Sequence, residues 1–520
     1  MIYRYFRNVA SLLIIMGLIF TVISRTVSAS QPAQASIEAI DTYITEQMTN
    51  LEIPGVVIGI VRGDQIVYVK GYGVADETGR AMTADTPFLI ASLSKSITAV
   101  GIMQLAEEGK IDLDAPVQNY LPWFRIADED VSTQITIRHL LHQTSGFSER
   151  EGYVRNLETN PAEVALEASI RDLSTAKLNF SPGEEFEYSN TNYDILGLII
   201  QTVSGQSYET YIEEKIFAPL DMDSSYTSLE EARAGNMSRG YYSFFGSPVA
   251  FDRLMPYSHT VKPSAGLFSS AKDLTRYLIA HLNEGRYEEN SILSPDGISK
   301  LHTPGIKFSD DASYAMGWTT FPFTDMAAAT QDNSIPTAIS HAGEWVGYTS
   351  LLVLVPELET GIVLLMNKSD PSRTPELFNL GWSLSMLAVG LEPLDTLSAD
   401  FVARNGRGLL AGVILLLGIG LVWSARKIRQ LLSQQGIDPS PGKKLVVQMV
   451  LLAIVDLILA VGLLLFKLPQ DNDTLSLALR FSPDIGLMYV LLLFLTLGWG
   501  LLRTILFIMY LLRTRTSSRA

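Results

Sequence analysis

Ile90-Ala91-Ser92-Leu93-Ser94-Lys95-Ser96 places a serine and a lysine three residues apart, where an apolar helical pattern begins. The pattern ends at Gly109, which predicts a helix that starts near Ser92. Residues three apart share one helix face, so the Lys95 ammonium is expected to reach the Ser92 hydroxyl. A lysine that loses its proton on desolvation can activate a serine as a nucleophile. The alternative is an ordinary solvated helix start, because this tetrapeptide alone is common.

The segments on either side of this helix predict a domain of the α/β class. An amphipathic helix is expected from Ser36, and β-branched runs predict two hairpins, over 56–70 and 348–366. A further helix is expected over 375–391. Strands at both ends of the body, with helical sequence between them, predict one antiparallel sheet with an inserted, mostly helical region.

A second polar group, Tyr188-x-Asn190, lies on a predicted loop just before a helix over 193–203. A tyrosine held beside Lys95 could carry protons, because a nearby cation favours the phenolate. Asn190 offers an amide donor and an acceptor to a peptide-like substrate. The alternative is that both residues form a turn or pack against the surface.

A third group, His341-Ala342-Gly343, stands just before the predicted strand 348–355. Small residues there would let a substrate backbone pair with the strand edge. The backbone N–H just after Gly343 and that of Ser92 could together face a developing oxyanion. The alternative is a turn that leads into a strand and contains an incidental histidine.

The three motifs Ser92-x-x-Lys95, Tyr188-x-Asn190 and His341-x-Gly343 occur in the order and approximate spacing of one known family. Between them stand further matching segments, namely 135–146, Pro182-Gly183, 219–222, 264–270 and Met316-Gly317-Trp318. On these residues the chain resembles the class C β-lactamase-like serine hydrolases, which include penicillin-binding carboxypeptidases, D-aminopeptidases and esterases. The resemblance covers roughly residues 36–390.

The resemblance implies a β-lactamase/DD-peptidase-like domain and a set of roles for the motif residues. Ser92 would be the acyl-accepting nucleophile, and Lys95 and Tyr188 would form the proton-transfer pair. Asn190 would contact the substrate amide, and the strand after Gly343 would bind the substrate backbone.

Histidines mark the departures from the family pattern. Many members carry lysine, which binds a substrate carboxylate, where this chain has His341; histidine is less reliably cationic. The glutamate loop of class A β-lactamases has no evident counterpart, so deacylation would fall to Tyr188 and its neighbours. His139 and His142 have a spacing that suggests zinc, but no third ligand is evident, so they are interpreted as structural. No metal or cofactor is expected, and His259 is a candidate for lining the substrate pocket.

The composition restricts the classes of partner. The 520 residues include no cysteine, which excludes disulfides, thiol nucleophiles and Cys-ligated metals. The net charge of −16 is unevenly distributed, since residues 401–520 carry +8 and residues 30–400 carry −27. An acidic body argues against a nucleic-acid partner, because binding to phosphates needs clustered Lys and Arg.

Residues 1–29 have the pattern of a secretory signal peptide. Arg4 and Arg7 precede an apolar run over 9–23, and Val27-Ser28-Ala29 offers a small-residue cleavage site. The alternative is an uncleaved membrane anchor. Either version directs the residues after it out of the cytoplasm, so residues 30–400 are predicted to form an extracytoplasmic domain.

Residues 401–520 contain three apolar segments that are long enough to span a membrane, and they predict a three-helix transmembrane domain. The segments are about 408–424, 445–466 and 485–512. Basic residues fill the first connection and the C-terminal tail, which predicts that both are cytoplasmic and that the body is outside. Arg404 and Arg407 lie on the side that this bias disfavours. The predicted location is the cell membrane, with several spans.

Asp456 lies inside the second predicted span, where a charge needs a partner. At ~1.5 Å per residue, Asp456 and Arg503 lie about 16 and 14 Å from the cytoplasmic ends of their spans. One prediction is an ion pair between the antiparallel second and third spans. The alternative, given equal weight, is a protonated Asp456 with Arg503 at the inner interface.

Together these patterns predict a membrane-anchored, extracytoplasmic serine hydrolase that forms an acyl-enzyme at Ser92. The expected substrates are small peptides or acyl amides of D-amino acids, in cell-wall peptides or N-acyl prodrugs. The layout also resembles membrane-bound peptidases that remove an N-acyl-D-asparagine group in natural-product maturation. The alternatives are an esterase or β-lactamase of the same family, a non-catalytic receptor for wall fragments or β-lactams, and a transport unit. The oligomeric state is left open.

Overall fold

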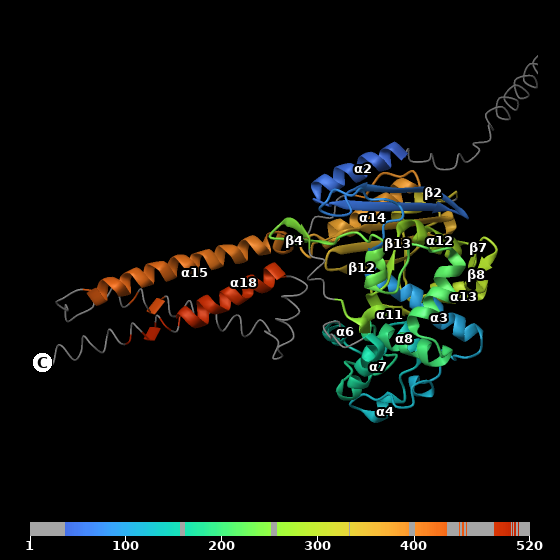
Figure 1. The fold of residues 1–520 in the computed structure, drawn as a ribbon, viewed down its shortest axis with the longest axis horizontal. Coiled ribbons are helices and arrows are strands. Elements are labelled where there is room, and N and C mark those ends of the chain that lie inside the picture. Colours follow the sequence, from blue (N-terminus) through green and yellow to red (C-terminus); the bar gives the residue numbers. More distant parts are fainter. Residues whose placement is uncertain are drawn as a thin grey trace, which may run out of the picture.

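The computed structural model describes the body of the chain and two C-terminal helices that extend from it (Figure 1). The described residues are 37–155, 162–250, 257–331, 333–394, 401–433 and 483–500, with isolated positions at 447, 450, 451, 454, 502, 504, 505 and 508. The predicted signal peptide, most of the predicted second span, and the proposed partners Asp456 and Arg503 lie outside the described residues.

An eight-stranded antiparallel sheet forms the centre of the body, in the order β2-β1-β14-β13-β12-β11-β10-β9. The strands are β1 (Gly55–Arg62), β2 (Gln65–Gly73), β9 (Ile306–Lys307), β10 (Ser313–Tyr314), β11 (Thr319–Pro322), β12 (Thr337–Trp345), β13 (Tyr348–Val355) and β14 (Thr360–Met366). β1 pairs with β14, so the two ends of the body build one sheet, as the sequence predicts.

Helices cover both faces of the sheet, so β1, β13 and β14 are buried along nearly their whole length (Figure 1). Helices α2 (Ile37–Asn50) and α14 (Thr374–Ala388) pack on one face and α12 (Ala271–Leu282) on the other. Side chains alternate across β1, so Ile58 belongs to the apolar cluster beneath α2, whereas Val57 belongs to the cluster on the opposite face. Both predicted hairpins and both flanking helices are confirmed.

The mostly helical region is inserted between β2 and β9, and α3 (Ser94–Glu107) is buried within it. Its other helices are α4 (Glu129–Ser132), α5 (Ile137–Leu141), α6 (Glu149–Arg155), α7 (Ala162–Arg171), α8 (Asn190–Ser204), α9 (Tyr208–Ile212), α10 (Leu229–Ala234), α11 (Lys262–Ala265) and α13 (Pro295–His302). Small sheets add β3 (Phe88–Leu89) with β6 (Phe268–Ser269), β7 (Arg286–Tyr287) with β8 (Asn290–Ser291), and β15 (Lys368–Ser369) with β4 (Tyr241–Phe244) and β5 (Ser247–Ala250).

The two C-terminal helices are α15 (Phe401–Ser433) and α18 (Pro483–Leu493), which continues as the π-helix η9 (Phe494–Trp499). Among the described residues, one helix, Arg407–Arg426, is long and apolar enough to cross a membrane. The three-helix arrangement predicted from the sequence is therefore not established. Asp484 at the start of α18 contacts Arg407 near the start of α15, and η9 packs along α15. Both helices accordingly run in the same direction away from the body (Figure 1).

Candidate active site

Ser92 lies in a tight turn between a strand and a buried helix. It belongs to the short 3₁₀-helix η1 (Ala91–Leu93), which comes after β3 and leads directly into α3. Ala91 has φ 49°, a left-handed conformation that is uncommon outside glycine. The surroundings hold this turn from two sides: the Ile90 N–H donates to the Leu267 carbonyl at 3.0 Å, and the Ile90 carbonyl accepts from Ser350 Oγ at 2.8 Å.

Lys95 lies one helical turn beyond Ser92 and is fully buried. Its Nζ is 3.2 Å from Ser92 Oγ, 2.7 Å from Asn190 Oδ1 and 2.8 Å from the Ser264 carbonyl oxygen. It also lies 4.7 Å from the centre of the Tyr188 ring. The structure thus brings Ser92, Lys95, Tyr188 and Asn190 together, although they come from two distant parts of the sequence.

The three contacts of Lys95 Nζ have a chemical consequence for its neutral form. A neutral amine has two N–H donors and one lone pair, and the Ser264 carbonyl can only accept a hydrogen bond. When the Asn190 amide oxygen and the Ser264 carbonyl take both donors, the lone pair is left for the Ser92 hydroxyl. Neutral Lys95 is therefore placed to accept the Ser92 proton.

Burial lowers the pKa of Lys95 to about 7, against the opposing effect of the Asp194 carboxylate. Asp194 is itself buried, with 4% of its surface exposed, and lies on α8 one turn beyond Asn190. Asp194 was not among the site residues predicted from the sequence. The spacing of four between Asn190 and Asp194 could have revealed it, because residues four apart share a helix face.

Gln143 fixes the segment that carries Tyr188 and Asn190. Gln143 has φ 60°, and its side-chain oxygen accepts a hydrogen bond from the Ser189 N–H at 3.0 Å. Its backbone carbonyl accepts from the Glu187 N–H, also at 3.0 Å. Gln143 lies in the segment 135–146, which matches the family pattern but carried no predicted function. Asn190 is the first residue of α8, whereas the sequence placed it on the loop before that helix. The segment that carries Tyr188 therefore ends at the positive end of the α8 dipole.

The sequence predicted no strand around His341, which it placed just before the strand 348–355, but the structure places His341 in the middle of β12. Burial, and then the nearby Lys95 charge, lower the pKa of His341 to about 3. Its Nδ1 lies 2.7 Å from the Ala342 carbonyl oxygen, so Nδ1 carries the proton. Nε2 then accepts from the Tyr314 hydroxyl at 3.3 Å. His341 is accordingly a neutral residue at this site.

Gly343 allows β12 to pass directly against the nucleophile. A Cβ added at Gly343 would lie 2.5 Å from the Ile90 carbonyl oxygen and 3.2 Å from the Ser92 backbone nitrogen. On its other edge β12 pairs with β11 only through residues 337–340. Beside His341 and Gly343, that edge has no strand partner among the described residues, so its backbone could pair with an extended substrate.

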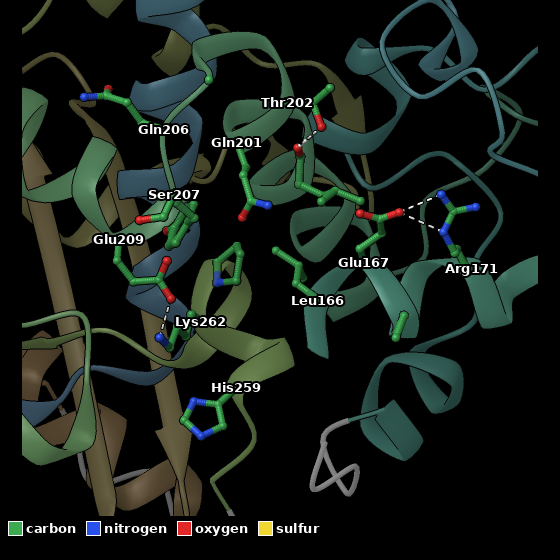
Figure 2. A pocket seen from close by; sticks show the side chains of 15 residues that line it. Leu166, Glu167, Arg171, Gln201, Thr202, Gln206, Ser207, Glu209, His259 and Lys262 are labelled. Atoms are coloured by element: carbon green, nitrogen blue, oxygen red, sulfur yellow. Dashed lines mark hydrogen bonds and ion pairs between the residues drawn. The ribbon is translucent and has the colours of Figure 1, made fainter. Parts of the chain in front are cut away.

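His259 is not part of this cluster. It belongs to η6 (His259–Val261) and lines a separate cavity of about 810 Å³ between α7, α8, α9 and α11 (Figure 2). None of Ser92, Lys95 and Tyr188 lines that cavity. The prediction that His259 contributes to the substrate pocket is therefore not supported. Sequence proximity to the segment 264–270 was misleading, because α11 turns His259 and Ser264 toward different spaces.

His139 has a structural role at the start of α5. Its backbone N–H donates to Thr136 Oγ1 at 3.2 Å, and its Nδ1 accepts from the Thr136 N–H at 3.3 Å. These two hydrogen bonds form a reciprocal N-terminal cap. Within the described residues, no group of three or more side chains of metal-ligating type comes together.

Comparisons with known proteins find similar sequences over most of the body. Residues 40–380 match the family model described as beta-lactamase. Protein flp of Staphylococcus aureus (strain MRSA252) is 32% identical over 337 residues, which cover 64% of this chain and 63% of flp. A putative D-alanyl-D-alanine carboxypeptidase of Escherichia coli (strain K12) is 25% identical over 395 residues, which cover 68% of this chain and 89% of that protein.

Two solved structures have a similar fold. The octameric penicillin-binding protein homologue from Pyrococcus abyssi superposes with a TM-score of 0.57 at 29% identity, over 70% of this chain and 79% of that one. The D-alanine carboxypeptidase AmpC from Burkholderia cenocepacia superposes with a TM-score of 0.55 at 24% identity, over 68% of this chain and 97% of that one. The second similarity concerns the fold alone.

Proposed function

The chain belongs to the beta-lactamase family, and on this premise we propose that it is a serine hydrolase that forms an acyl-enzyme at Ser92. The arrangement around Lys95 Nζ carries this proposal. A buried amine with a pKa of about 7 is partly neutral at neutral pH, and its lone pair faces a hydroxyl 3.2 Å away. A purely binding protein would not need this arrangement.

In the proposed reaction, Ser92 Oγ attacks the substrate carbonyl while Lys95 takes its proton. The Ser92 N–H and the backbone N–H just after Gly343 stabilise the oxyanion. Lys95 and Tyr188 return the proton to the leaving group, which breaks the amide bond and leaves an ester at Ser92. Water then hydrolyses that ester with Tyr188 and Lys95 as the proton acceptors, and Ser92 is regenerated.

We propose amides of D-amino acids as the substrates, in cell-wall peptides or N-acyl prodrugs. The name of the Escherichia coli relative supports a D-amino-acid peptide. The neutral state of His341 argues against strict recognition of a terminal carboxylate, because this residue supplies no positive charge. For the same reason, hydrolysis of an uncharged ester is the second candidate activity.

We further propose that α15 anchors the enzyme in the membrane and that the body lies outside the cell. The 33 residues of α15 extend about 50 Å, enough to cross a ~30 Å hydrocarbon layer. Helix α18 also begins beside the body, where Asp484 contacts Arg407 and Tyr242, and it leads away from the body in the direction of α15 (Figure 1). Two segments that lead away from the body in the same direction support the three predicted crossings and a cytoplasmic C-terminus.

The test uses the full chain with Ser92→Ala, and Ser299→Ala on the surface of α13 as the matched control. We expect Ser92→Ala to lower turnover by at least about 1000-fold and to abolish labelling by a fluorescent β-lactam or a fluorophosphonate. Substrate panels would contain D-Ala-D-Ala peptides, N-acyl-D-asparagine amides and simple esters. Hydrolysis that persists in Ser92→Ala would disprove the mechanism. Labelling of the unmodified chain without turnover of any substrate would favour a receptor.

A further inference from the structure

A buried carboxylate lies at the start of α18, where that helix meets the body. The Asp484 side chain is fully buried, and its Oδ2 lies 2.7 Å from Arg407 Nε on α15. Its Oδ1 accepts a hydrogen bond from the Tyr242 hydroxyl at 2.9 Å, and its Oδ2 accepts from the Phe245 N–H at 3.3 Å. Tyr242 and Phe245 belong to the body, at β4 and the turn directly after it. Asp484 therefore joins both C-terminal helices to the body.

Arg407 completes this junction from the side of α15. Its Nη1 donates to Asp370 Oδ1 at 3.0 Å and to the Ser372 hydroxyl, and its Nη2 lies 3.4 Å from the Tyr242 hydroxyl. The side chains of Arg407 and Asp370 are only 14% and 4% exposed. Burial raises the pKa of Asp370, but hydrogen bonds from Ser372, Ser243 and Arg407 outweigh it and keep the pKa below its usual value.

One guanidinium thus lies between two buried carboxylates that come from different parts of the molecule. Removing the guanidinium from such a cluster leaves two uncompensated buried carboxylates, which is strongly unfavourable. A flexible tether would anchor the body without any buried charge. The cluster also accounts for Arg407 on the side that the positive-inside bias disfavours, because Arg407 has specific acidic partners there.

We infer that Tyr242, Phe245, Asp370 and Ser372 form a docking surface on the body for the paired starts of α15 and α18, with Arg407 as its central contact. The docking surface holds the body in one orientation relative to the two helices. This inference goes beyond the proposed hydrolase activity and does not depend on it.

The docking surface is connected to the active site through short hydrogen bonds. The Gly347 N–H, in the turn between β12 and β13, donates to Ser369 Oγ at 2.8 Å, directly before Asp370. Thr374 Oγ1 donates to Glu344 Oε1 at 3.0 Å, directly after Gly343. The strand that passes Ser92 is therefore hydrogen-bonded to the segment that carries Asp370 and Ser372, the residues that Arg407 contacts.

The absence of cysteine makes a direct distance measurement possible. Spin labels would be attached at Ile66→Cys on β2 and Leu416→Cys on α15, which are 38% and 69% exposed, in the full chain reconstituted in lipid nanodiscs. Double electron–electron resonance should give one narrow distance distribution. Arg407→Gln should broaden it at least twofold, whereas Arg426→Gln, at the exposed far end of α15, should leave it unchanged.

A second variant keeps the test decisive if Arg407→Gln does not fold. Asp484→Asn removes one of the two carboxylates and leaves Arg407 paired with Asp370, and it should also broaden the distribution. The thermal unfolding of each variant, followed by tryptophan fluorescence, shows whether the body is intact. A narrow, unshifted distribution in Arg407→Gln, or in Asp484→Asn if the first variant does not fold, would overturn the inference. This measurement needs no turnover, so it is independent of the proposed function.

Discussion

Lys95 and Asp194 together set the pH at which Ser92 can react. Acylation needs neutral Lys95, so kcat/KM should rise with pH, with a midpoint near the Lys95 pKa of about 7. The Asp194 carboxylate favours the ammonium form. Asp194→Asn should therefore lower the Lys95 pKa and move the midpoint to lower pH, with little change in the plateau rate.

A pH–rate profile of both forms of the enzyme with an uncharged ester substrate measures this shift. Asp296→Asn, on the exposed surface of α13, is the control and should leave the midpoint where it is. A midpoint that stays fixed or rises in Asp194→Asn would show that Asp194 does not act on Lys95.

Gly343 provides a second test at the level of a single residue. Gly343→Ala places a methyl group against the Ile90 carbonyl and the Ser92 nitrogen, which should displace β12 from the nucleophile. Acylation should slow on the order of 100-fold, as when one oxyanion donor is lost. Stopped-flow acylation by a chromogenic β-lactam measures this rate. Gly412→Ala, where an added Cβ meets nothing within 4 Å, should react at the normal rate.

The motif residues of the site could be predicted from the sequence because their spacing is local. Ser92 and Lys95 are one helical turn apart, and Tyr188 and Asn190 flank the start of one helix. The spacing of four places Asp194 on the same face of α8 as Asn190, but its effect on Lys95 depends on how α8 packs against α3. The same reason explains the misplacement of His259, whose environment depends on the packing of α11.

Among the elements, α12 and α13 meet through a pair of buried histidines. His281 Nδ1 and His302 Nε2 lie 2.9 Å apart, one as donor, beside Trp318. Burial lowers the pKa of His302 to about 4 and that of His281 well below its usual value. The unfolded chain binds protons near pH 6.5 that the folded chain does not bind, so stability should fall as the pH drops from about 6.5 to 4.

For His302 alone, this loss should be on the order of 3 kcal/mol across that range. Urea unfolding of the full chain at a series of pH values, followed by tryptophan fluorescence, measures it. His302→Gln removes the titrating group and should flatten the pH dependence, whereas His259→Gln, on the wall of the separate cavity, should change it less. An equally steep pH dependence in His302→Gln would contradict the assignment.

Strands whose own sequence is rich in β-branched and apolar residues were predicted correctly. Strands that depend on pairing with their neighbours were not predicted. The hairpins of β1–β2 and β13–β14 consist of β-branched and other apolar runs, so their sequences alone favour strands. β12 contains Thr337-Ala-Ile-Ser-His-Ala-Gly, whose small and polar residues give no such pattern. The two-residue strands β9 and β10 exist only because neighbouring strands pair with them.

For the whole molecule, the docking surface predicts how the body depends on its C-terminal helices. A chain that ends at residue 400 lacks Arg407 and Asp484, so Tyr242 and Asp370 lose their buried partners. Its Tm should fall by a few degrees, while turnover of a soluble substrate should be retained. Thermal unfolding of the chains ending at 400 and at 433 checks this, because the longer chain keeps Arg407. Equal Tm values for the two, or loss of turnover in the shorter chain, would contradict the prediction.

The common direction of α15 and α18, with Arg407 and Asp484 at their starts, affects how substrate would be encountered in a bilayer. An active site that keeps one orientation relative to α15 and α18 stays at a constant height above the lipid headgroups and meets only substrates at that height. For a lipid-borne substrate, diffusion then becomes a two-dimensional search within one leaflet. Its turnover would scale with surface density instead of bulk concentration, and diluting the substrate with inert lipid would slow the enzyme at unchanged total concentration.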